Sequence, residues 1–205
     1  MKTTKLFFIA LLLCAISSAA MAQIEKGKNV VGGYASYHIN DRGLTTTDYY
    51  IGPRYGRLIS KDFEIGISIG YSASIKEYAA SAKTTTRTFF GGPYVKLYRN
   101  LSEHFYFDAS LILGYSSGKI VYDDTQGVNI IGQNTNIDVT VLSAKVAPAL
   151  TYLFNNHWAA EFSVGIFNYT NTRTKYNNSS SPSLVGDFTM GIFAPESGIG
   201  IEYYF

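Results

Sequence analysis

The sequence contains little cysteine and proline, and no long apolar run follows its first residues. Cys14 is the one cysteine among 205 residues, so a disulfide framework is excluded. No later apolar run approaches the roughly 18 residues that a transmembrane helix needs, so a helical membrane protein is also excluded. Only five prolines accompany 17 tyrosines and 13 phenylalanines. A chain so rich in aromatic residues is not disordered.

The first residues have the features of a secretory signal. Lys2 and Lys5 precede an apolar stretch, 6–16, that is too short to span a bilayer, and small residues end at Ala20-Met21-Ala22. These are a positive n-region, an apolar h-region and an A-x-A cleavage site. We therefore predict that residues 1–22 are a cleaved signal peptide and that residues 23–205 form one domain.

Cleavage would remove the only cysteine and leave a chain without net charge. Lipid attachment at Cys14 is an alternative, but it needs a small residue before the cysteine, and Leu13 stands there. Without Lys2 and Lys5, 15 of the 17 basic residues remain against 15 acidic ones. No basic patch predicts a nucleic-acid partner.

The mature chain is organised by alternation. From Phe63 to Ser72, apolar residues alternate without interruption with polar or small ones. A period of two is that of a β-strand with one apolar and one polar face. The pattern recurs on either side of short connections at 59–62, 99–103 and 155–157, so the chain repeats a hairpin.

Eight strands fit this pattern, and the connections between them alternate in length. The predicted strands are Lys28–Ile39, Thr47–Leu58, Phe63–Ser74, Arg87–Tyr98, His104–Ser117, Ile137–Phe154, Trp158–Thr170 and Asp187–Phe205. The long connections, rich in Thr, Ser, Asn and Gly, are 40–46, 75–86, 118–136 and 171–186. Short turns on one side and long polar loops on the other are typical of transmembrane barrels. We predict an all-β fold, an eight-stranded antiparallel up-and-down transmembrane β-barrel whose two ends lie on the periplasmic side.

The two faces of the strands differ in charge. The apolar faces exclude charge over about 9–11 residues, the length of a tilted strand that crosses hydrocarbon, and aromatic residues flank them as interfacial girdles do. The opposite faces collect the charged residues Arg54, Glu64, Lys96, Asp108, Lys145, Glu161, Glu196 and Glu202. A soluble lipocalin would turn the apolar face inward, and a β-sandwich would bury it; both are alternatives to the membrane barrel.

These eight charged residues are the candidate lumenal site. An eight-stranded barrel is just wide enough for its side chains to fill it, and charges in that space must be paired or hydrated. We therefore expect a ring of ion pairs near the periplasmic end. Such a ring either plugs the lumen permanently or acts as a gate that admits water or small ions.

Four prolines recur at matching positions of alternate strands, on the predicted lipid face. They are Pro53, Pro93, Pro148 and Pro195. Proline cannot donate to a sheet ladder and is normally found at bulges or edges. We therefore predict a repeated bulge or weak point near the middle of these strands.

Residues with catalytic or ligand-binding chemistry are few. The histidines are His38, His104 and His157, and only His38 is placed near the outer end of a predicted strand, where an outer-leaflet lipid enzyme would act. We predict no catalytic, cofactor-binding or metal-binding residues, no cofactor and no enzymatic activity. A lipid-modifying enzyme that uses His38 is the remote alternative.

The chain resembles the small outer-membrane β-barrel proteins of Gram-negative bacteria. These include the outer membrane protein beta-barrel domain group and the transmembrane barrels of the outer-membrane protein A and X types. The resemblance covers residues 23–205, and its most specific feature is the C-terminus, where Ile201, Tyr203 and Phe205 look like the signal that the barrel assembly machinery reads. It implies a location in the outer membrane, contact with outer-membrane lipids and a lumenal ion-pair network.

Two functions are favoured over the enzyme. The first is a structural or surface-interaction role, in which the connections 75–86, 118–136 and 171–186 meet an unidentified host or surface ligand. The second is a narrow pore for small solutes or ions, gated by the lumenal ion pairs. An isolated barrel with a charge-free outer wall needs no partner, so we expect a monomer.

Overall fold

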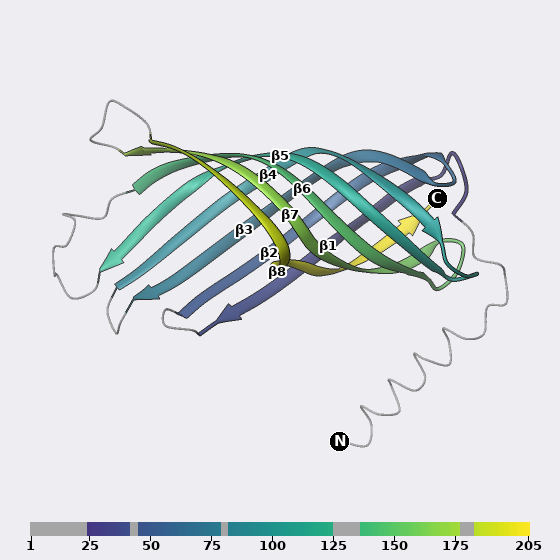
Figure 1. Cartoon of the computed structure of the whole chain (residues 1–205), viewed down its shortest axis with the longest axis horizontal. Coiled ribbons are helices and arrows are strands. Elements are labelled where there is room, and N and C mark those ends of the chain that lie inside the picture. The colour runs from purple at the N-terminus through teal and green to yellow at the C-terminus, as the bar shows by residue number, and fades with distance from the viewer. Residues whose placement is uncertain (1–23, 42–44, 79–81, 125–135, 177–182) are drawn as a thin grey trace, which may run out of the picture.

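The computed structural model describes residues 24–41, 45–78, 82–124, 136–176 and 183–205. Its strands are β1 (Asn29–Asn40), β2 (Thr45–Ser60), β3 (Phe63–Tyr78), β4 (Ala82–Asn100), β5 (Phe105–Asp124), β6 (Asn136–Leu153), β7 (Trp158–Tyr176) and β8 (Ser183–Tyr204). Each strand pairs antiparallel with the next, and β8 pairs with β1 to close a barrel (Figure 1). The predicted eight-stranded up-and-down barrel is confirmed, and the closed sheet excludes a β-sandwich. The predictions for the signal peptide and Cys14 lie outside the described residues.

The strands are longer than the apolar alternation predicts. The β3–β4 ladder continues to the pair Tyr78–Ala82, and the β4–β5 ladder to the pair Ala82–Asp124. The predicted connections 75–86, 118–136 and 171–186 are therefore too long, because strand residues occupy much of each. Backbone hydrogen bonds hold a ladder with polar as well as apolar side chains, and threonine favours strands. The sheet thus continues beyond its apolar belt. None of the described residues forms a helix long and apolar enough to cross a membrane.

Side chains alternate between the outer wall and the lumen. On β3, Ile67 is 60% exposed and Ile69 59% exposed, whereas Glu64 on the other face is fully buried. This is the reverse of a soluble barrel, which keeps apolar residues inside. Outward-facing aromatic residues lie near the turn end and near the far end of the wall; among the exposed ones are Tyr37, Phe89, Phe105, Tyr115, Trp158, Tyr169, Phe188 and Phe205. The outer wall therefore has the apolar band and aromatic girdles of a barrel surrounded by lipid.

The lumen is filled with apolar side chains at the end where the short turns lie. This turn-end core consists of Ile24, Val30, Leu58, Tyr98, Tyr106, Leu153, Ala159 and Tyr204. Ile24 precedes β1, and the turn that follows it is fixed by a hydrogen bond of 2.8 Å from the Gly27 amide to the Leu58 carbonyl. Gly27 has φ of 90°, a conformation that glycine adopts without strain. The segment before β1 thus helps to seal this mouth of the barrel.

We expect Ile24→Ala to lower the free energy of unfolding by about 2 kcal/mol, because it leaves a cavity in the turn-end core. Urea titration of the refolded protein in phospholipid vesicles would measure the change. Leu101→Ala is the control, since Leu101 is 58% exposed in the turn before β5. Equal losses for the two variants would show that Ile24 does not pack in the mouth.

The prolines do not form one repeated bulge. The β2–β3 ladder is interrupted at Pro53 and the β4–β5 ladder at Pro93, but the register is the same on both sides of each proline. A register shift does occur across Pro148, between Val146 and Ala149. The β7–β8 ladder also shifts, opposite the segment that contains Pro195. At Pro53 and Pro93 there is therefore no bulge but a weak point, the other form that the sequence predicts, because the missing N–H interrupts one of the two ladders and adds no residue.

Candidate functional site

Six of the eight predicted lumenal charges meet at one level of the barrel. Two cations, Arg54 of β2 and Lys96 of β4, both bond to the carboxylates of Glu161 on β7 and Glu202 on β8. Lys96 Nζ lies 2.5 Å from Glu161 Oε2 and 3.0 Å from Glu202 Oε1. All four side chains are buried, and those of Lys96 and Glu202 are fully so. The pairs therefore join strands that lie far apart in the chain across the lumen.

The carboxylate of Asp108 on β5 completes the shell around Lys96. Its Oδ1 lies 3.4 Å from Lys96 Nζ, and Thr151 of β6 donates a hydrogen bond of 2.7 Å to its Oδ2. Asp108 and Thr151 are both fully buried. Because both side chains are fully buried, the hydroxyl supplies a bond that solvent would make at an exposed carboxylate.

Replacing Thr151 with valine tests this bond at nearly constant volume. We expect Thr151→Val to lower the free energy of unfolding by about 2 kcal/mol, since it leaves a buried carboxylate oxygen without its donor. The urea midpoint in vesicles would report the loss. Thr151→Ser keeps the hydroxyl and should lower the free energy of unfolding by less than Thr151→Val does. A valine variant as stable as the parent would contradict the assigned bond.

Tyrosine hydroxyls donate hydrogen bonds to the carboxylates of Glu64 and Glu202. These tyrosines were not predicted as part of the site. Tyr94 and Tyr98 each donate to one oxygen of Glu64, and Tyr204 donates to Glu202 Oε2 at 2.5 Å. The period of two of a strand is the signal that could have identified these tyrosines. Tyr94 and Tyr98 stand two residues on either side of Lys96, and Tyr204 stands two residues after Glu202. Residues two apart share a face, so these tyrosines had to enter the lumen with the charges.

We call the ten side chains of this level the charge cluster. Its members are Arg54, Glu64, Tyr94, Lys96, Tyr98, Asp108, Thr151, Glu161, Glu202 and Tyr204. The remaining two predicted charges are placed differently. Lys145 lies in the lumen wall farther from the turns, and the side chain of Glu196 lies outside the described residues.

Glycines make room for the large lumenal rings. A Cβ on Gly56 would meet the hydroxyl of Tyr94, and one on Gly66 would meet its ring. Gly52 and Gly70 stand in the same relation to Tyr50. The rings of neighbouring aromatic side chains therefore pack directly against the glycines that alternate along these strands. A larger residue at these positions would prevent this close packing.

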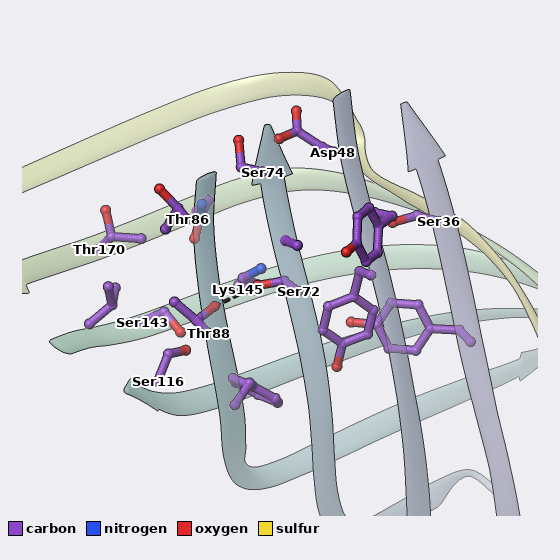
Figure 2. A pocket seen from close by; sticks show the side chains of 17 residues that line it. Ser36, Asp48, Ser72, Ser74, Thr86, Thr88, Ser116, Ser143, Lys145 and Thr170 are labelled. Carbon is purple, nitrogen blue, oxygen red and sulfur yellow. Dashed lines mark hydrogen bonds between the residues drawn. The ribbon is translucent and has the colours of Figure 1, made fainter. Parts of the chain in front are cut away.

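A polar cup lies in the lumen on the side of the charge cluster that is away from the short turns. It has a volume of about 310 Å³ and is lined by 17 residues of β1 to β7, of which eight are serine or threonine (Figure 2). The charged lining residues are Asp48 and Lys145. Between the cup and the cluster, a void of about 20 Å³ bordered by Arg54, Lys145 and Glu161 has room for about one water. The lumen therefore narrows from a cup to a nearly solid cluster.

A further hollow of about 1150 Å³ lies on the outer wall and is separate from the charge cluster. Its walls include Ile51, Phe162, Ile199 and Ile201, which face outward, and it lies over the glycine-containing part of β1. There β1 pairs with β8 only over 30–35, whereas its ladder with β2 covers the whole strand. The hollow is mostly apolar, but Tyr34 and Ser36 line both it and the polar cup, so it adjoins the lumen where the β1–β8 ladder ends.

Among the described residues, His38 has no catalytic arrangement. The ladders place Asp48 between His38 and Ser74, opposite each of them. Activating a serine needs the histidine in the middle position, next to the hydroxyl. His104 and His157 lie at the turn end, where their rings contact tyrosines. Among the described residues, no group of three or more His, Cys, Asp or Glu side chains is placed to hold a metal ion.

The C-terminal residues alternate as the resemblance implies. Ile201 and Phe205 are exposed on the outer wall, while Glu202 and Tyr204 between them are buried in the lumen. Tyr203 packs against Trp158 and Phe205, with ring centroids 4.8 and 6.0 Å apart. The three residues predicted as an assembly signal therefore lie on the lipid face.

Comparisons with known proteins agree on the fold. No protein-family model matches the chain, and no curated protein matches its sequence. Among solved structures, the chain is similar to the outer membrane protein OprG of Pseudomonas aeruginosa, with 13% identity, a TM-score of 0.53, and coverage of 90% of this chain and 98% of that one. It is also similar to the N-terminal β-barrel domain of OprF from the same organism, with 11% identity, a TM-score of 0.50, and coverage of 88% and 98%. The fold is that of the outer-membrane β-barrels.

Proposed function

We propose that this protein is a sealed outer-membrane barrel with a structural or surface-interaction role. It would act through the end that it exposes outside the cell. The observation that carries the proposal is the filled lumen, in which the turn-end core continues through Tyr98 and Tyr204 into the buried charge cluster. The signal-like residues 1–22 and the fold support export to the outer membrane. The barrel would sit there as a monomer among outer-membrane lipids, after the assembly machinery has read Ile201, Tyr203 and Phe205.

A gated pore is the weaker proposal. Lys96 contacts carboxylates from three other strands, and opening the cluster would separate these fully or nearly fully buried ion pairs. Removing one partner of a buried ion pair typically costs 3–5 kcal/mol, about the scale of a whole gating equilibrium. We therefore propose a permanent plug, and we propose no enzymatic activity because the described residues of the lumen form no activated nucleophile.

The cysteine-free mature chain allows a direct test of location and orientation. Single cysteines would replace Lys83, near the far end of β4, and Lys61, in the turn between β2 and β3; both positions are exposed. In intact cells, a membrane-impermeant maleimide should label Lys83→Cys and leave Lys61→Cys unlabelled. Permeabilising the outer membrane should then expose Lys61→Cys.

The cysteine-free parent is the control for background labelling. Labelling of Lys61→Cys, but not of Lys83→Cys, in intact cells would reverse the orientation. Equal labelling of both positions in intact cells would show either that the protein is not inserted or that the reagent passes through the lumen, and either result contradicts the proposal.

A further inference from the structure

The polar cup has the composition of a small-molecule site, and what it would bind can be argued from its lining. Its volume of about 310 Å³ suits a ligand of one ring or a few linked groups. The cup ends at the charge cluster, so it does not continue to the turn end of the barrel. Any ligand in it would be held rather than passed on, which agrees with the surface role proposed above.

Hydroxyl groups and aromatic rings dominate the cup. Serine and threonine supply eight hydroxyls, each able to donate one hydrogen bond and accept two. Ser72 and Thr88 already lie 2.5 Å apart, and Figure 2 shows their oxygens among those that line the cup. Tyr34 and Tyr50 stack with ring centroids 4.7 Å apart, and Phe90 adds a third ring. Hydroxyls beside apolar rings suit a ligand that itself has polar edges and an apolar face, as a pyranose sugar does.

The charged and amide groups of the lining further restrict the class of ligand that the cup could bind. Lys145 of β6 lies opposite Asn168 of β7 in the ladder, and both line the cup. The buried Oδ1 of Asn168 has no hydrogen-bond partner among the described residues, so a donor from a ligand would remove a desolvation cost. One lysine can pair with one carboxylate. A phosphate would bring more negative charge into a cup that contains Asp48 and has no arginine among its described lining residues; arginine is the residue that holds phosphate with two bonds.

We propose that the cup binds an acidic sugar, with the ligand carboxylate at Lys145, a ligand hydroxyl donating to Asn168 Oδ1 and the ring against the tyrosines. This proposal deepens the surface-interaction function and rests on it. A uronic acid, either free or at the end of a surface polysaccharide, has this chemistry. The free sugar and the polymer would present the same terminal group to the cup.

Three monosaccharides that differ mainly in charge test the assignment. Saturation-transfer NMR and calorimetry would compare D-glucuronate, D-glucose and D-glucosamine on the refolded mature chain in detergent micelles. We expect glucuronate to bind about tenfold more tightly than glucose, the effect of one charge-assisted hydrogen bond, and glucosamine to bind most weakly. Lys145→Met should bring glucuronate to the affinity of glucose. Methyl-capped oligouronates, added next, would show whether a chain end is accepted.

Two variants keep the test decisive. Lys119→Met removes an exposed lysine of the outer face of β5 and should leave glucuronate binding unchanged. Asn168→Leu should weaken all three sugars together. Absence of saturation transfer from any sugar, or a glucuronate affinity indifferent to Lys145→Met, would overturn the proposal. Failure here would leave the sealed barrel intact, whereas a conducting barrel that still binds glucuronate would overturn the sealed lumen and leave the sugar site.

Discussion

Lys96→Met is expected to lower the free energy of unfolding by about 4 kcal/mol, because it removes a fully buried cation and leaves three carboxylates facing one another. Arg54 would remain as the only cation of the charge cluster, against four carboxylates. Refolding into vesicles followed by urea titration would measure the loss. The gel shift on heating would show whether the variant folds at all.

Two further variants separate charge from packing. Lys119→Met removes a lysine of the same size from an exposed position and should change stability by less than about 0.5 kcal/mol. In the double variant Lys96→Met with Glu161→Gln, one carboxylate of the group loses its charge, so part of the stability should return. If Lys96→Met were as stable as the parent, the lysine would not be holding the cluster together.

Gly66→Val is expected to have a similarly large effect for a steric reason. A Cβ at this position would meet the Tyr94 ring as well as backbone atoms of Tyr55 and Gly56, so neither side can yield without moving the ladder. The valine would expel Tyr94 from the lumen and remove its bond to Glu64. We expect the variant to refold poorly and to lose the heat-dependent gel shift of the parent.

Gly186→Val is the matched control. No heavy atom would lie within 4 Å of a Cβ on Gly186, so the same change in β8 should be tolerated. A double variant, Gly66→Ala with Tyr94→Phe, keeps the steric conflict with the ring but removes the hydroxyl. If this double variant refolded as well as Tyr94→Phe alone, a glycine at position 66 would not be required to accommodate the ring at position 94.

Period-two alternation was enough to predict the barrel, because each face of a strand has one environment. Apolar residues of β3 lie outside and Glu64 lies inside, and the same rule brought Arg54, Lys96 and Glu161 together from separate hairpins. The alternation marks only the apolar belt, however. It could not show where the strands end, because the ladders above the belt are held by backbone hydrogen bonds between polar residues.

The sequence did not reveal the level along the barrel axis at which each lumen-facing side chain lies. Tyr98 and Lys145 are both lumen-facing, yet one belongs to the charge cluster and the other lines the cup. Which level a residue reaches is set by the stagger between strands, and the bulges at Val146/Ala149 and in the β7–β8 ladder change that stagger. Alternation alone contains no information on it.

Single-channel conductance of the refolded mature chain in a planar bilayer tests the sealed lumen most directly. Insertion would be confirmed in the same preparation by the heat-dependent gel shift. We predict an inserted protein without discrete openings, because the turn-end core and the charge cluster fill the lumen in series. Steady, discrete openings of the inserted parent protein would contradict the sealed barrel and make the charge cluster a gate.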